Sequence, residues 1–572
     1  MTERDPADAA SAGAAQSSVR LGQDASATGG DATMGAEPGQ ADDRAGRGRA
    51  PRRLAIATAI FAVATGISRI AGLAREVVAA SYFGTGGAAS AFTFAFQLPN
   101  LIRALVADAA LSSAFVPVFS DLMARQKRAE AAALAGSLFG VILVALGALT
   151  LAFILLAGVI VPPLTGDSFT PALDGLTTGL TRVLFPIVVL LALNGLVVGI
   201  LNAHDHFSIP AIAPLVWNLV IIAGLVLLTP LFEGDDRLYA YAIGVLAGTA
   251  VQYAMCLPTL KRIGFKLHPS LNFNDPRIAQ VLKLMLPVSI GIGLINVNLL
   301  INTTIGTLIS DEVPAAIDKA FRIYMLPQGI FSVAVATVLF PSLSRLASRR
   351  DLDGLRSVTG NGTRQIALLL IPSAAATIAL AMPMVRLVYE RGEFDVESTR
   401  LVSEALFWFS FSLPFSGINL LLTRTFFALQ RPWLPTRLAV GTLIINVAVS
   451  VALYRPIGIG GVVLGTAVST AAMTVGQAWV LRSELHGIEL RRTLIAMAQI
   501  LAASVAFGLV AYAGWWVLDH ALGRSLLAEI VSVGGGLTAG TLVYGGLVLL
   551  MRIPEAQQIL DLFTARLRRR AS

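Results

Sequence analysis

The feature that most constrains this chain is a series of apolar runs, each about as long as a bilayer is thick. A helix needs roughly 20 apolar residues to cross the hydrocarbon core, and only helices or closed barrels satisfy their backbone hydrogen bonds there. The runs begin near Leu54, Ala88, Ala131, Leu176, Ile209, Leu238, Ile278, Pro314, Thr363, Leu401, Leu434, Ile459, Leu494 and Leu527. The sequence therefore predicts an all-α integral membrane protein with about fourteen transmembrane helices.

Composition supports this prediction and excludes other classes of protein. Of the 572 residues, 55% are hydrophobic and 14% are charged, whereas a soluble chain carries about 25% charged residues. Cys256 is the only cysteine, so a disulfide framework is excluded. The net charge is +8. The basic residues lie in short loops and form no continuous patch of the kind that a nucleic-acid duplex needs, so we expect no nucleic-acid partner.

Loop charge predicts the orientation of the helices. Basic residues gather before the first run, after runs two, six, eight and twelve, and at the C-terminus. The intervening loops, such as PPLTGDSFTPALDG and FEGDDR, are acidic or nearly neutral. Because positive loops stay in the cytosol, this alternation predicts an even number of spans with both termini cytosolic.

The chain is expected to have five parts. Residues 1–53 are rich in Ala, Gly, Asp and Ser and predict a disordered cytosolic tail. Spans two and eight share a weak likeness, six spans apart, which indicates two related six-helix halves at 54–260 and 261–485. Two further spans occupy 486–552, and a basic cytosolic tail occupies 553–572.

Four arginines fall within or near the ends of predicted spans, namely Arg69, Arg75, Arg103 and Arg322. Such a charge is costly at the bilayer centre and usually faces a watery cavity or a partner. Neighbours on a helix surface lie three or four positions apart, so we expect neither Arg103 with Asp108 nor Arg75 with Glu76 to pair. Guanidinium groups suit phosphate oxygens, which predicts a phosphate-bearing ligand. Snorkelling to the interface is the alternative for Arg75 and Lys319.

No catalytic or metal-binding constellation stands out. The five histidines are scattered, whereas an enzyme acting on polyprenyl phosphates would need acids or histidines gathered on a loop. His204 and His206 are the one close pair, on a short turn where plain solvation is the simpler interpretation. We therefore expect no enzyme activity, no metal and no cofactor.

Several longer motifs carry a family resemblance. They are SRIAGLAREVVAASYFGTGGAASAFTFAFQLPNLIRALVADAALSSAFVPVFS, LNAHDHFSIPAIAPLVWNLVIIAG, RIYMLPQGIFSVAVATVLFPSLSR, LVYERGEFD and LLTRTFFALQ. In these stretches the chain resembles the MurJ (MviN) lipid II flippases, within the superfamily of multidrug and oligosaccharidyl-lipid exporters. The matches run in family order from span one to span eleven.

The resemblance implies two six-helix lobes around a central cavity, with the last two helices forming a groove for a lipid tail. It implies alternating access in a bacterial cytoplasmic membrane, with lipid II, membrane lipids and cell-wall synthesis machinery as partners. The family's essential arginines fall on Arg69, Arg75, Arg103 and Arg322, and Glu76 matches an acid of the outer gate.

Three positions depart from the family pattern. The family's acid before AF of span two is Ser90 here, which puts a gate ion pair with Arg75 in doubt. The usual Glu-Gly of span two is Asp108-Ala109, and an acid of the ALQDT motif has become Arg431. Coupling to a cation or to the membrane potential is therefore left open. The alternatives are an exporter of another polyprenyl-linked oligosaccharide or of a drug, and a transport-inactive scaffold for cell-wall assembly.

Overall fold

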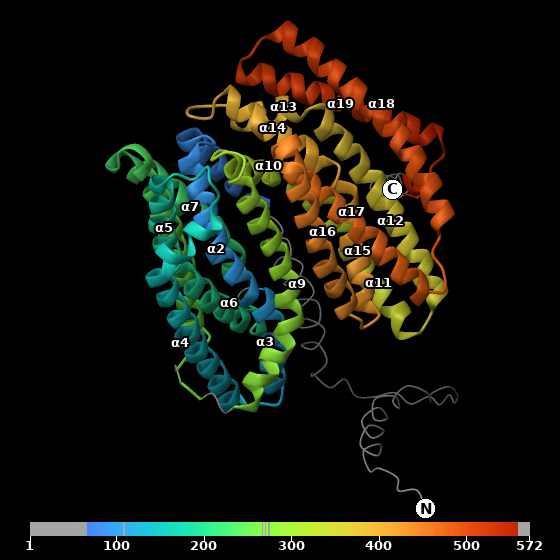
Figure 1. Cartoon of the computed structure of the whole chain (residues 1–572). Coiled ribbons are helices and arrows are strands. Elements are labelled where there is room, and N and C mark those ends of the chain that lie inside the picture. The colour runs from blue at the N-terminus through green and yellow to red at the C-terminus, as the bar shows by residue number, and fades with distance from the viewer. Residues whose placement is uncertain are drawn as a thin grey trace, which may run out of the picture. The chain divides into compact units, whose positions relative to one another are not determined.

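A computed structural model describes residues 64, 66–106, 109–265, 267–268, 270–272 and 275–558. The chain divides into two units, Met1–Thr58 and Ala59–Ser572, and every described residue belongs to the second. The described residues form helices and no β-strand, as the sequence predicts (Figure 1). The predicted tail at 1–53 and the end of the basic tail, from residue 559, lie outside them.

Eleven helical stretches of the described residues are long and apolar enough to cross a membrane. They are α4 (Arg128–Ile160), α5–α6 (Pro171–Ala203), α7 with a short extension (Ser208–Leu231), α8 with its lead-in (Gly234–Arg262), α9 (Pro276–Gly306), α10–α11 (Val313–Ser348), α12 (Leu352–Ala379), α16 (Trp433–Ile457), α17 (Ile459–Glu484), α18 (Leu490–Leu522) and α19 (Leu526–Leu550). A twelfth span results if α14 (Val396–Ser410) and α15 (Leu413–Ala428), which meet at 48°, are one broken span.

The predicted number of fourteen spans is not confirmed by this count. Two further helical stretches occupy the positions predicted for spans one and two. Residues 66–83 form the first of these. The second consists of α2 (Gly87–Val106) and α3 (Ala109–Ala124), which flank two residues that are not described.

Short polar side chains fix where several helices begin. The carboxylate of Asp351 accepts a hydrogen bond from the Gly354 backbone N–H at 2.8 Å, which caps α12. The Asp395 carboxylate accepts a hydrogen bond from the Ser398 backbone N–H, also at 2.8 Å, which caps α14. This hydrogen bond lowers the pKa of the Asp395 carboxyl. Such caps satisfy donors that the first helical turn leaves unpaired. They therefore set the ends of apolar helices whose middle residues carry no boundary signal.

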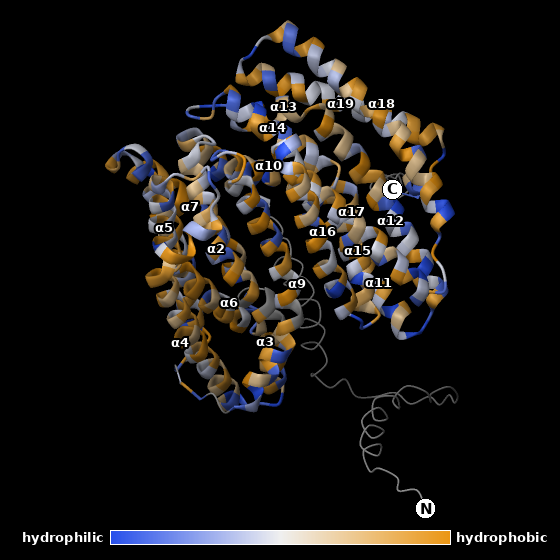
Figure 2. Ribbon diagram, in the orientation of Figure 1, coloured by the Kyte–Doolittle hydropathy of each residue, from blue (hydrophilic) through white to orange (hydrophobic). Residues whose placement is uncertain are grey.

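The buried core follows the chain in separate clusters. Residues before α9 form two clusters: one contains Phe94, Phe115 and Phe185 together with the start of α9, and the other contains Phe92 and Tyr241. Residues from the end of α9 to α17 form a third cluster around Phe409 and Phe426, which Ala80 of the helix at 66–83 joins. Figure 2 shows hydrophobic residues along the helices and hydrophilic residues gathered near their ends. The predicted lobe boundary at 260/261 falls in the last turn of α8 and the one at 485/486 falls between α17 and α18; both remain predictions.

The last two helices, α18 and α19, pack on each other and on α12. Ion pairs, buried at one end and partly buried at the other, tie both ends of this hairpin to the rest of the bundle. Arg364 of α12 pairs with Glu555, after α19, and with Glu489 at 2.7 Å, before α18. At the other end, Arg386 of α13 (Ala381–Tyr389) pairs with Asp519 of α18, and with Glu529 of α19 at 3.0 Å.

Candidate functional site

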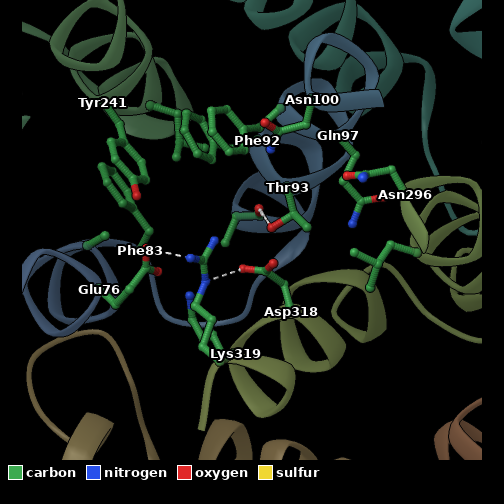
Figure 3. A pocket seen from close by; sticks show the side chains of 16 residues that line it. Glu76, Phe83, Phe92, Thr93, Gln97, Asn100, Tyr241, Asn296, Asp318 and Lys319 are labelled. Atoms are coloured by element: carbon green, nitrogen blue, oxygen red, sulfur yellow. Dashed lines mark hydrogen bonds and ion pairs between the residues drawn. The ribbon is translucent and has the colours of Figure 1, made fainter. Parts of the chain in front are cut away.

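A pocket lies between the helix at 66–83, α2, α8, α9 and α10 (Val313–Pro327), with a volume of about 150 Å³. Aromatic rings line one part of it, and Phe92 stacks on Tyr241 with the ring centroids 4.1 Å apart. Amide side chains of Gln97, Asn100 and Asn296 line another part (Figure 3). The pocket therefore offers apolar, neutral polar and charged surfaces within a bundle of apolar helices.

Arg322 is the predicted arginine that lines this pocket. Its guanidinium group pairs with the Glu76 carboxylate at 2.9 Å and with the Asp318 carboxylate at 2.8 Å (Figure 3). Asp318 lies one turn earlier on α10, at the spacing that brings two side chains of a helix together. Glu76 belongs to the helix at 66–83, so its pairing with Arg322 joins segments about 250 residues apart.

Arg75 and Glu76 also pair with each other, which contradicts the expectation that adjacent residues of a helix cannot meet. Two side chains held straight would diverge, but the Arg75 guanidinium lies over the Trp217 ring, 4.7 Å from its centroid. From there it reaches the same Glu76 oxygen that Arg322 contacts. The long side chain of arginine thus overcomes the unfavourable spacing, and one carboxylate bridges two arginines.

Arg103 and Arg69 do not join this cluster. The Arg103 guanidinium donates to the side-chain oxygen of Asn100, a residue that lines the pocket, at 3.0 Å. Arg69 is exposed and lies beside Gly329, in the π-helical turn Gln328–Ser332 between α10 and α11 (Val333–Ser348). The structure thus brings together Arg75, Glu76 and Arg322, while Arg69 and Arg103 stand apart.

Ser90 is fully buried at the start of α2. Its hydroxyl oxygen accepts a hydrogen bond from the Ala315 backbone N–H at 3.1 Å, in the first turn of α10. Arg75, which the family resemblance would pair with an acid at the Ser90 position, contacts Glu76 instead. Asp108, the other predicted support, lies outside the described residues.

Asp318 is a site residue that sequence reasoning missed, although its four-residue spacing to Arg322 was visible. Lys319, for which snorkelling was an alternative, is buried and lines the pocket. The cluster thus holds three cations (Arg75, Lys319 and Arg322) against two acids (Glu76 and Asp318), so its formal net charge is +1. No group of three or more His, Cys, Asp or Glu in the described part of the chain is placed to hold a metal.

A family model described as "Lipid II flippase MurJ" matches residues 79–530. The chain is 31% identical over 492 residues to the probable lipid II flippase MurJ of Rhizobium meliloti (strain 1021), covering 83% of this chain and 90% of that protein. It is 31% identical over 410 residues to the lipid II flippase MurJ of Burkholderia cenocepacia, covering 70% of this chain and 78% of that protein.

Solved structures show the same fold. The inward closed conformation of a lipid II flippase MurJ matches with a TM-score of 0.72 at 22% identity, covering 86% of this chain and 99% of that one. An inward-facing transporter of the multidrug resistance MATE family, in the MOP superfamily, matches with a TM-score of 0.61 at 16% identity, covering 75% and 94%.

The helical bundle and its charged internal pocket define a polytopic membrane transporter. The family model spans most of the chain, and curated relatives share 31% of its residues over most of their length. The chain therefore belongs to the lipid II flippase MurJ family, which confirms the resemblance in its motifs.

Proposed function

We propose that this protein moves lipid II, the undecaprenyl-diphosphate-linked peptidoglycan precursor, from the inner to the outer leaflet of the cytoplasmic membrane by alternating access. The observation that carries this proposal is the pocket cluster with three cations and two acids inside an apolar bundle. A diphosphate can take the place of the Glu76 carboxylate in its ion pair with Arg322, because guanidinium forks match phosphate oxygens. The polyprenyl chain stays in lipid throughout.

The size of the pocket supports a cycle with more than one conformation. A volume of about 150 Å³ is that of about five water molecules at roughly 30 Å³ each, which is too little for a diphosphate carrying sugars and a peptide. The headgroup must therefore meet these residues in a more open state than the one described.

Reconstitution tests the proposal. Vesicles containing only this protein should move fluorescent lipid II between leaflets, and protein-free vesicles should not. A drug exporter, the alternative suggested by the MATE-like fold, would move a cationic drug and leave lipid II in place. A transport-inactive scaffold for cell-wall assembly would move neither substrate and would not restore growth of a flippase-depleted strain.

We infer that both termini face the cytosol, because loop charge alternates along the whole chain. Cysteines introduced at Asp167 and Asp235, both exposed, should react with a membrane-impermeant maleimide added to intact cells. A cysteine at Arg349, also exposed, should react only after lysis. Native Cys256 is buried and should stay silent. Labelling of the Arg349 position in intact cells would show that the orientation is the opposite of the one proposed.

Energy coupling and further partners are also proposals. Arg75, Lys319 and Arg322 give the cluster a formal net charge of +1 against Glu76 and Asp318, so a membrane potential that is negative inside would act on the loaded and the empty cluster differently. Membrane lipids cover the exposed apolar helix faces. A contact with the cell-wall synthesis machinery is proposed only because lipid II, the proposed substrate, is a cell-wall precursor.

A further inference from the structure

Two loops that lie more than 300 residues apart meet through their backbones. The turn at residues 84–86 joins the helix at 66–83 to α2, and the loop at 390–395 joins α13 to α14. The Glu393 backbone N–H donates to the Ser81 carbonyl at 2.9 Å. The Thr85 hydroxyl donates to the Ser398 hydroxyl at 2.9 Å. These bonds connect the two predicted lobes at the end that loop charge places outside the cell.

Two glycines make this approach possible. Gly84 has a φ of +56°, and a Cβ on it would lie 2.5 Å from the Glu393 carbonyl oxygen. Gly392 has a φ of +62°, and a Cβ on it would lie 2.2 Å from the Ser81 carbonyl oxygen. Any side chain at either position would therefore meet both an unfavourable backbone conformation and a backbone atom of the opposite loop.

Other contacts between the predicted lobes lie at this same end. The Gly166 backbone N–H donates to the Thr307 hydroxyl at 2.8 Å, and Ser90 accepts from Ala315 as described above. Asp311 lies against Gly87, the first residue of α2. Small residues and hydrogen bonds thus contribute to closing the outer end of the described bundle.

Acidic side chains surround the closed contact. Burial raises the pKa of Glu312, which ends the loop before α10, and the carboxylates of Asp311, Asp395 and Glu397 raise it further. Like charges held together oppose closure, so the hydrogen bonds and backbone contacts must outweigh this repulsion.

We propose that Gly84 and Gly392 are positioning residues of an outer latch, defined as residues 81–86 and 392–394, that must meet backbone to backbone for the outer side to close. The inference rests on the proposed alternating access. Opening toward the outside separates the two loops, and closing requires both glycines to fit again. A side chain at either position therefore holds the protein in outward-open states without touching the pocket.

The chain supplies a matched control for this proposal. Gly234 lies in another predicted outer loop and has a φ of +53°, but a Cβ on it would meet nothing within 4 Å. Gly234→Ala therefore carries the same backbone strain as Gly392→Ala without the collision. The two variants separate closure of the latch from a general cost of placing alanine at positive φ.

The test measures access to the pocket from outside. A reporter cysteine replaces Thr93, which lines the pocket, in a Cys256→Ala background, and intact cells are treated with a membrane-impermeant maleimide. Gly392→Ala should raise the labelling rate about tenfold, the change that a shift of ~1.4 kcal/mol produces, and Gly234→Ala should leave it unchanged. Equal rates for both variants would overturn the latch.

A second variant keeps the test decisive if Gly392→Ala does not accumulate. Cysteines at Ser81 and Glu393, the residues joined by the backbone hydrogen bond, should form a disulfide that lowers labelling at the Thr93 position, and reduction should restore it. Unchanged labelling after cross-linking would also overturn the latch. Neither measurement depends on lipid II transport. A negative result would overturn the latch and leave the proposed lipid II transport untouched, and a positive result would hold even if lipid II were not the substrate.

Discussion

Arg322→Ala is expected to abolish translocation of lipid II in reconstituted vesicles. The substitution removes the guanidinium group that lines the pocket and leaves Glu76 and Asp318 there with fewer positive partners. The cluster then changes from a net +1 to a net zero charge, and the pocket loses its fork for phosphate oxygens. Arg322→Lys should recover part of the activity, because lysine keeps the charge but not the paired donors.

Arg125→Ala is the matched control for Arg322→Ala. Arg125 also pairs with an acid four residues earlier, Asp121, at 3.0 Å, but the side chains of both residues are exposed. Its loss should leave translocation unchanged, since exposed pairs contribute little. Equal activity of Arg322→Ala and Arg125→Ala, at equal protein levels, would remove Arg322 from the substrate site.

Arg364→Ala should cause a large loss of stability. Arg364 and Glu555 are almost fully buried, and Glu489 completes the cluster that holds the hairpin of α18 and α19 at one end. Removing one member of a buried ion pair leaves an uncompensated charge and costs about 3–5 kcal/mol. The free energy of unfolding in detergent micelles should fall by that amount.

Arg431→Ala provides the comparison for Arg364→Ala. Arg431 pairs with Glu484 at 2.5 Å, but its side chain is 56% exposed, so its loss should cost no more than about 1 kcal/mol. If the two variants lose the same stability, the buried cluster does not fasten the hairpin. The same pairing gives Arg431, which departs from the family motif, a structural partner.

The sequence predicted the fold well because the bilayer imposes one length and one backbone solution on every span. It predicted less about interruptions inside spans. The bend between α14 and α15 and the π-helical turn Gln328–Ser332 lie in apolar sequence, where hydropathy is indifferent to local backbone geometry. For the same reason the number of spans is less certain than their existence.

The site was predictable in part, for a related reason. A charged residue stands out in an apolar run, so the free-energy cost of placing a charge in the bilayer was enough to predict Arg322 and Arg75 as site residues. Their partners could not be assigned, because the meeting of Glu76 with Arg322 depends on packing between distant helices. The expectation that adjacent helical residues cannot pair was wrong for Arg75, whose guanidinium group lies over the ring of Trp217, 142 residues away.

The bridge between Glu76 and Arg322 has a thermodynamic consequence. It joins a helix of one predicted lobe to a helix of the other, so a ligand that binds Arg322 must compete with a contact that holds the two lobes together. Occupancy and lobe separation then share one coupling free energy, and linkage makes that coupling reciprocal. Any substitution that strengthens the bridge must weaken the affinity of the ligand, and any substitution that weakens the bridge must raise that affinity while making the two lobes easier to separate.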